Sequence, residues 1–309
     1  MSFLQIRRAG LLTTIQDEGR WGYQDRGVSV AGPMDAYSHR LANLLVGNDA
    51  AAATLEVTSS GPEIEFEESA IFAVTGAAFD LTLDGIHVPM NRMASAQAGS
   101  CLDFHQRSRA ARAYIGVAGG ILVPTLLGSR STHVLSRMGG VNGRPLQAGD
   151  RLETGEPYDL SSRFHRQRPA AMVLPDGGAR IRAIPGPHSA RFSEATIASL
   201  EKARYRLSMR CDRMGYQLEG PPLQCLTGEE LISDAMPVGG LQVPPSGQPI
   251  LLMADRATTG GYPIIATVIT ADLPAAGQLL PGDWIEFAFC SLEQARMALR
   301  QQTQALNGV

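Results

Sequence analysis

Polar side chains and glycines gather in a few stretches of this 309-residue chain. An apolar core does not need such runs of arginines, acids and hydroxyls, so they are the first places to look for chemistry. Arginines and hydroxyls that converge can hold a carboxylate or a phosphate through paired hydrogen bonds, and a carboxylate beside them can transfer a proton. The stretches are 13–27 (TTIQDEGRWGYQDRG), 127–133 (LGSRSTH), 211–220 (CDRMGYQLEG) and 244–263 (PPSGQPILLMADRATTGGYP).

Structural roles compete with functional ones in these stretches. Asp17 can pair with Arg20 to tie down a loop, and the adjacent acid and base at 212 and 213 can do the same. The run 129–132 (SRST) can be a plain polar turn, although its many hydrogen-bond donors suit an anion. The loop that starts at Asp255 follows a buried strand, LLMAD, and binding residues often stand at strand ends. A functional role is therefore favoured for that loop, and the sequence leaves the others open.

Short strands are the elements that must position these stretches. Between residues 54 and 105, apolar and polar residues alternate in runs such as PEIEF and FDLTLDG, which turn residues separate. This pattern returns after residue 204 in YRLSMR and GYQLEG, and it is typical of half-buried antiparallel strands. Amphipathic helices are expected after the N-cap residues Asp35 and Ser193 and over 291–306. The pattern predicts a mainly β chain with a few peripheral helices.

The length of the chain suits two domains of about 150 residues each. A polar stretch with arginines and prolines at 159–178 is predicted to link them, which gives domains at 1–160 and 175–309. AGDRLET (148–154) and PGDWIEF (281–287) look like the closing strands of two related halves. Duplication explains this echo, and so does chance, because Gly-Pro and Gly-Asp turns are common in β proteins.

Composition and charge argue against several classes of protein. A net charge of −3 gives no basic field for nucleic acid. The best apolar run, 114–128, is too short and too rich in glycine and proline to span a bilayer, and the start of the chain has no signal-peptide pattern, so a cytoplasmic protein is predicted. The four cysteines and six histidines show no zinc-binding spacing, and no metal site is expected.

Lys202 is the single lysine among the 27 basic residues. A Walker A loop requires a lysine after its glycines, and a biotin carrier requires one in an exposed hairpin. Lys202 instead lies in the amphipathic helix that follows Ser193, where it is expected to face solvent. The sequence therefore predicts no P-loop and no covalent biotin on this chain.

The polar stretches also resemble a known family. The sequence is similar to the family of C-type 5-oxoprolinase subunits, also called KipA or allophanate hydrolase subunit 2, at the motifs TTIQDEGRWGYQDRGVSVAGPMD, LGSRST, CDRMGYQLEG, QVPPSGQPI and ADRATTGGYP. This family is related to the carboxyltransferase domain of urea carboxylase, and the resemblance runs from about Gly10 to Phe287. Two departures leave roles open: Cys211 stands where the family usually has serine, and Asp234 lies where it usually has glutamate and glycine.

The resemblance implies two cyclophilin-like β-barrel domains. It implies the C-type component of an ATP-dependent 5-oxoprolinase, a hydrolase that opens 5-oxo-L-proline to L-glutamate and that also needs A-type and KipI-like B-type subunits. ATP with Mg would be shared with these partners. Two other functions stay open on the same scaffold. One is a biotin-dependent carboxyltransferase subunit that acts on urea or another amide, and the other is a non-enzymatic partner of a KipI-like kinase inhibitor.

Residue type and loop position nominate the site for the oxoprolinase reaction. A substrate carboxylate and a transferring phosphoryl group call for arginines, and proton or metal–nucleotide handling calls for acids. The candidate catalytic residues are Asp17, Asp212 and Asp255. The candidate substrate-binding residues are Arg20, Ser129, Arg130, Ser131, Arg213, Gln242, Arg256, Thr258 and Tyr262.

Overall fold

The computed structural model describes residues 2–157, 170–226 and 231–307. The chain divides into two compact units. Unit 1 comprises residues 1–21, 31–174 and 304–309, and unit 2 comprises residues 22–30 and 175–303. Of the predicted linker at 159–178, residues 159–169 lie outside the described residues.

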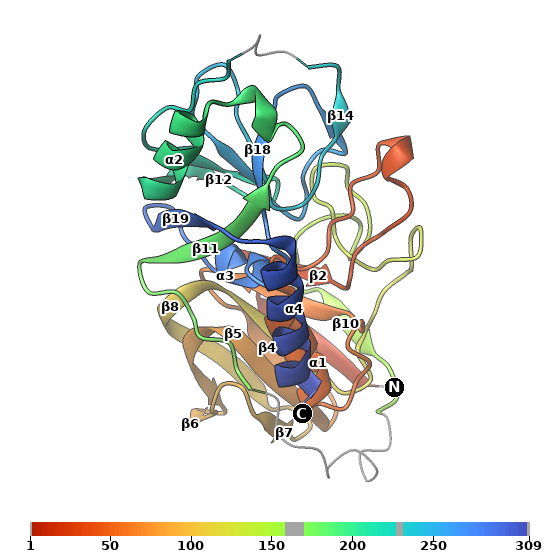
Figure 1. Cartoon of the computed structure of the whole chain (residues 1–309). Helices are drawn as coiled ribbons and strands as arrows, with labels where there is room; N and C mark the ends of the chain where they lie inside the picture. The colour runs from red at the N-terminus through yellow and green to blue at the C-terminus, as the bar shows by residue number, and fades with distance from the viewer. Residues whose placement is uncertain (1, 158–169, 227–230, 308–309) are drawn as a thin grey trace. The chain divides into compact units, whose positions relative to one another are not determined.

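Unit 1 is built around one antiparallel sheet of ten strands (Figure 1). The strands are β1 (Ser2–Arg8), β2 (Leu12–Gln16), β3 (Thr54–Thr58), β4 (Glu63–Phe66), β5 (Ala70–Leu83), β6 (Ile86–His87), β7 (Met93–Ala96), β8 (Cys101–Val117), β9 (Ile121–Leu122) and β10 (Arg151–Thr154). The main path runs β2-β3-β8-β4-β1-β10-β9, and β5 pairs with β6, β7 and β8. Burial alternates along strands such as β4 and β10, so one face encloses an apolar core that includes Leu4, Ile64 and Phe72.

The long strand β8 is buried on both faces over its second half. Residues 110–117 are all buried, because helix α1 (Ala36–Leu45) packs against β8 and β5. The two elements approach so closely that a Cβ atom on Gly116 would lie 2.7 Å from the carbonyl oxygen of Ala42. Asp35 caps the helix by accepting a hydrogen bond from Ser38 N–H, as predicted. The cap and the close approach together fix where α1 begins and how it lies on the sheet.

A buried polar contact anchors the segment that leads into α1. Tyr114 on β8 donates a hydrogen bond to the carboxylate of Glu56 on β3 at 2.7 Å, and Met34 N–H donates to the same oxygen at 2.8 Å. Asp35 N–H donates in turn to the Tyr114 hydroxyl at 2.8 Å. Burial and the neighbouring carboxylates raise the pKa of Tyr114 well above its ordinary value, so the phenol keeps the proton that it donates.

Unit 2 contains a closed barrel of seven strands. They are β11 (Gly178–Pro185), β18 (Ile264–Val268), β15 (Gly240–Gln242), β16 (Ile250–Leu252), β13 (Gly215–Glu219), β12 (Arg204–Cys211) and β19 (Trp284–Phe289), given in their order around the barrel. The parallel pairing of β11 with β19 closes it, and the other pairs are antiparallel. A separate ribbon of two strands joins β14 (Asp234–Ala235) to β17 (Thr259–Gly260).

Helices flank the barrel of unit 2. Helix α2 (Glu194–Lys202) packs against β19, and α3 (Leu273–Gly277) packs against β11. Ser193 caps α2 by accepting a hydrogen bond from Thr196 N–H, and Lys202 is exposed, as the sequence predicted. Helix α4 (Leu292–Asn307) ends in unit 1, where Leu306 packs with Tyr37 and Leu41.

The prediction of a mainly β chain with two barrels and a few helices is confirmed. Over the described ranges, nineteen strands stand beside four α-helices. Every helix in that part of the chain is too short or too polar to cross a bilayer.

Gly119, two residues after the end of β8, tests the packing of unit 1. Its φ is +91°, and a Cβ atom there would lie 2.0 Å from the carbonyl oxygen of Gly155. Gly119→Ala should therefore cost about 3 kcal/mol or more, because overpacking adds to left-handed backbone strain. Gly99→Ala is the matched control, since Gly99 has a φ of +84° and nothing within 4 Å of an added Cβ. It should cost only the ~1–2 kcal/mol of strain. Equal melting temperatures for the two variants would contradict the close contact.

Candidate functional site

The candidate residues of unit 1 converge on one carboxylate. Asp17 is 8% exposed, and it accepts hydrogen bonds from the hydroxyls of Ser129 at 2.5 Å and Ser131 at 2.6 Å. It also accepts the N–H groups of Arg130 at 2.5 Å and Gly19 at 3.0 Å. Burial acts to raise the pKa of Asp17, but these donors outweigh burial and the pKa is lowered. The geometry is that of an ionised anchor for a loop rather than of a proton acceptor.

Two arginines extend this anchor. Arg20 is fully buried and donates a hydrogen bond to the carbonyl oxygen of Ser131 at 2.5 Å. Arg130 donates through Nε–H to the carbonyl oxygen of Val123 at 3.2 Å. Asp17 thus takes hydroxyl and amide donors from the segment 129–131. These contacts fasten the segment between β9 and β10 to the end of β2.

A buried ion pair joins two of the predicted stretches in unit 2. Arg213 donates two hydrogen bonds of 2.9 Å to the two carboxylate oxygens of Asp255, and both side chains are 7% exposed. Asp212, the partner that the sequence suggested for Arg213, is exposed and accepts the N–H groups of Met214 and Gly215 in a turn. Asp255 therefore positions a loop, since both of its oxygens are held by Arg213.

Arg256 follows this pair and lines a pocket of about 420 Å³ within unit 2. Its Nε–H donates to the carbonyl oxygen of Met236 at 2.7 Å, and its own carbonyl accepts from the Ser29 hydroxyl at 3.1 Å. The residue is 8% exposed, and burial lowers the pKa of its guanidinium. No carboxylate of the described residues pairs with it. Its two terminal nitrogens are left for an anion that enters the pocket.

The wall of the pocket is largely apolar, with a few polar groups at fixed places. Its lining residues are Gln24, Val30, Pro187, Asp234, Ala235, Met236, Pro237, Arg256, Ala257 and Thr258. Gln24 begins the short 3-10 helix η1 (Gln24–Arg26), and two of the lining segments flank or form the β14–β17 ribbon. Concave sites of this make-up are typical of small-molecule binding.

Arg256 and Thr258 are the two predicted site residues that line this pocket. Gln242 lies nearby, with its amide nitrogen 3.6 Å from the sulfur of Met236, and Tyr262 is 38% exposed. Sequence reasoning missed Gln24, although it belongs to the first polar stretch. It also missed Pro187, which belongs to no motif, and it noted Asp234 only as a departure from the family pattern without a role.

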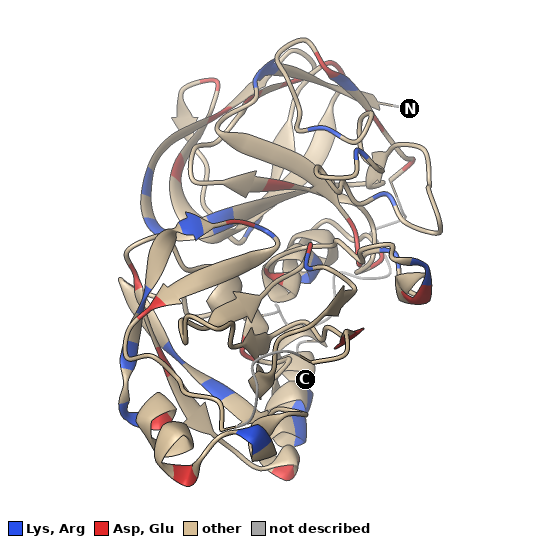
Figure 2. Cartoon of the chain, turned by 90° about the horizontal axis from the view of Figure 1, so that it is seen from above, with Lys and Arg blue, Asp and Glu red and all other residues tan. Residues whose placement is uncertain are grey.

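Acidic and basic residues are interspersed along the strands and helices of each unit (Figure 2). The net charge of the chain is −3. Arg256 and Asp234 are the charged residues among those that line the pocket.

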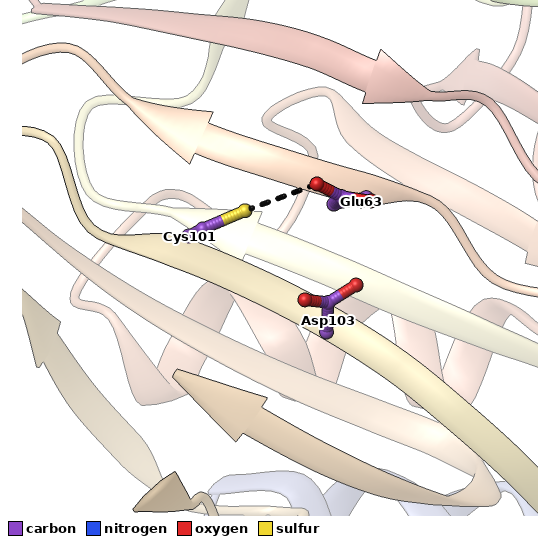
Figure 3. A group of neighbouring side chains, drawn as sticks. All are labelled: Glu63, Cys101 and Asp103. Carbon is purple, nitrogen blue, oxygen red and sulfur yellow. Dashed lines mark hydrogen bonds between the residues drawn. The ribbon is translucent and has the colours of Figure 1, made fainter. Parts of the chain in front are cut away.

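Unit 1 holds one group of side chains that could bind a metal, among the residues that the structure describes. Glu63 on β4 and Cys101 and Asp103 on β8 project from neighbouring strands (Figure 3). The Cys101 thiol donates a hydrogen bond of 3.7 Å to Glu63, and Asp103 pairs with Arg8 at 3.5 Å. Burial, with help from the two acids, raises the pKa of Cys101 to about 11, so its thiol is protonated at neutral pH. We assign no metal to this group.

A family model described as "Carboxyltransferase domain, subdomain A and B" matches residues 26–289. The chain belongs to the carboxyltransferase-domain family. The matched region of this family includes every lining residue of the pocket except Gln24, and it begins after Asp17 and Arg20.

Individual relatives narrow this placement within the carboxyltransferase-domain family. The C-type subunit of 5-oxoprolinase from Escherichia coli K12 is 42% identical over 299 residues, which are 97% of this chain and 95% of the relative. The corresponding 5-oxoprolinase protein of Haemophilus influenzae is 38% identical over 93% of this chain and 91% of its own length. The crystal structure of K. lactis urea amidolyase matches with a TM-score of 0.92 at 30% identity, over 99% of this chain and 20% of that one. The resemblance read from the motifs is confirmed.

Asp17→Asn should destabilise the protein, because an amide NH₂ replaces an oxygen that faces hydrogen-bond donors. The cost should be about 1–3 kcal/mol at pH 7. Folding lowers the pKa of Asp17, so its stabilisation is present above the unfolded value of 3.8 and is lost as pH falls through the folded pKa. Melting curves should show the deficit of the variant shrinking below about pH 4.

Asp25→Asn is the control for this series, since its side chain is 75% exposed. It should melt like the wild type at each pH. An Asp17→Asn deficit that stays constant down to acid pH would show that the charge of Asp17 is not what holds the loop.

Proposed function

We propose that this chain is the C-type subunit of an ATP-dependent 5-oxoprolinase, which opens 5-oxo-L-proline to L-glutamate together with A- and B-type subunits. One similarity carries the proposal: the E. coli 5-oxoprolinase protein of C type is 42% identical over 97% of this chain and 95% of its own length. A relation that spans both chains favours the same role in the same kind of assembly.

The unit 2 pocket supports a role in holding the substrate. 5-Oxoproline carries a carboxylate, and the planar guanidinium of Arg256 can donate two parallel hydrogen bonds to its oxygens. The bond from Nε–H to the carbonyl oxygen of Met236 fixes the guanidinium before a ligand arrives, which reduces the entropy lost on binding. The apolar neighbours Val30 and Met236 exclude water and strengthen the charged contact.

Two of the three acids expected to handle a metal–nucleotide are already engaged by the protein itself. Asp17 is engaged by hydroxyl and amide donors, and both oxygens of Asp255 are held by Arg213. ATP with Mg supplies the phosphoryl group that activates the otherwise unreactive lactam. We propose that the partner proteins provide its binding site.

A biotin-dependent carboxyltransferase subunit that acts on urea or another amide is the second candidate. The family itself and the TM-score of 0.92 to K. lactis urea amidolyase favour it. Biotin would then have to arrive on a separate chain, since the single lysine here lies on α2. A purely regulatory partner of a KipI-like protein would bind that protein without any turnover in the assembly.

The wild-type chain alone should show little or no 5-oxoproline-dependent ATP hydrolysis. Activity should appear when A- and B-type partners are added, measured as phosphate release together with glutamate formation. Carboxyl transfer from a biotinylated chain to urea, without glutamate, would favour the second candidate. Full activity of the isolated chain would contradict its role as one part of a larger enzyme.

Arg256→Lys should lower kcat/KM of the assembled enzyme about ten- to a hundredfold. An ammonium cannot donate two parallel hydrogen bonds, and a charged hydrogen bond lost in the transition state costs about 1.5–3 kcal/mol. Arg296→Lys, on the exposed side of α4, is the matched control and should stay within about twofold. Thermal melting checks that both variants are folded. Equal activities would remove Arg256 from the site.

A further inference from the structure

We propose that Asp234 is a second recognition point of the unit 2 pocket, so that the pocket selects ligands that carry both a carboxylate and an N–H donor. This inference rests on the proposed function and deepens it. Arg256 holds the carboxylate, and Asp234 accepts a hydrogen bond from the ring N–H of the lactam.

The carboxylate of Asp234 has an oxygen left for a ligand. The residue lines the pocket, and its side chain is 65% exposed. One oxygen accepts the N–H of Ala235 at 2.7 Å, and the other lies 4.0 Å from Nε2 of His188, beyond hydrogen-bond distance. Among the described residues these are its polar contacts. The second oxygen can therefore accept a donor that enters the pocket.

One ribbon holds Asp234 and Arg256 in a fixed relation. Asp234 on β14 is paired with Gly260 on β17, and Met236 N–H donates to the carbonyl oxygen of Thr258 at 3.0 Å. Arg256 is tied to the same ribbon by its 2.7 Å bond to the carbonyl oxygen of Met236. Over the described ranges Asp234 and Arg256 form no ion pair with each other, so they remain two separate poles of opposite charge.

His188 is the nearest side chain of opposite polarity to Asp234 among the described residues, with Nε2 at 4.0 Å from Oδ2. Its Nδ1 accepts the N–H of Ile264 at 3.2 Å, which assigns the proton of the neutral ring to Nε2. Nε2 is the atom that faces Asp234, and the preceding residue, Pro187, lines the pocket. The ring N–H of His188 thus lies on the pocket side of Asp234, beside the oxygen that a ligand would meet.

A lactam such as 5-oxoproline matches both poles. Its carboxylate stands on the carbon next to the ring nitrogen, so the anion and the N–H donor share one edge of a small ring. The lactone of the same shape keeps the carboxylate but presents a ring oxygen, whose lone pairs would face the Asp234 carboxylate. A site built to hydrogen-bond an N–H rejects such an isostere far better than an apolar pocket does.

The test measures selectivity by titration calorimetry on the assembled complex without ATP. The probes are 5-oxo-L-proline and its lactone counterpart, 5-oxotetrahydrofuran-2-carboxylate. The wild type should prefer the lactam about ten- to a hundredfold. Asp234→Asn should reduce this preference to about threefold or less, because its amide can donate to the lactone oxygen, and Asp234→Ser should also reduce it. Arg256→Lys should weaken both ligands alike, and Glu293→Gln, exposed on α4, should change neither.

Equal binding of lactam and lactone by the wild type overturns the proposal, and so does the absence of lactam binding. An unchanged preference in a folded Asp234→Asn variant overturns it as well. This outcome is separable from failure of the proposed function. An assembly that turns over 5-oxoproline while Asp234→Asn keeps full selectivity removes the role of Asp234 alone. An assembly that binds the lactam selectively through Asp234 but never forms glutamate removes the oxoprolinase reaction alone.

Discussion

The buried ion pair between Arg213 and Asp255 is the contact on which the unit 2 pocket depends. Two charges taken out of water are costly unless each is fully paired, and a bidentate geometry meets that condition. The pair joins the turn after β12 to the loop after β16, and backbone hydrogen bonds from Asp255 to Arg213 and from Met253 to Met214 reinforce the junction. Because Arg256 follows Asp255 directly, the ion pair also fixes the backbone from which the Arg256 side chain extends toward a ligand.

Unit 1 also buries a carboxylate, and it offsets the cost of removing that charge from water in a different way. Asp17 has hydroxyl and amide donors around it, and these stabilise the anion. In both units the carboxylate is engaged by hydrogen bonds that hold a loop in place. The pocket differs, since among the described residues the Arg256 guanidinium contacts one backbone carbonyl and one oxygen of Asp234 has no short contact. Residues that hold a loop in place and residues that can bind a ligand are therefore of the same types. They differ in whether their polar atoms already have partners within the protein.

The fold could be predicted from patterns that span a few residues. The site could be predicted only in part, because its residues are brought together by contacts between distant parts of the chain. Alternation over a few residues identifies strands such as β13, and Asp35 and Ser193 mark helix starts because each accepts an N–H three residues on. Sequence proximity suggested Asp212 as the partner of Arg213, yet the true partner lies 42 residues further along the chain. Gln24, Pro187 and Asp234 share no motif, and only the folded barrel and its ribbon bring these segments to one pocket.

The two charged poles of the pocket also bear on its energetics. Arginine keeps its charge in proteins, and burying a guanidinium with a single carbonyl partner costs stability that a nearby ion pair would restore. The ribbon nevertheless holds Asp234 and Arg256 apart, although Asp234 lies close in the chain to Met236, whose carbonyl binds the arginine. A pair that closed on itself would stabilise the free protein and would have to be broken for each ligand. Because Asp234 and Arg256 do not pair with each other, their charged interactions stabilise the complex with a ligand and not the free protein. This arrangement is expected of a recognition site.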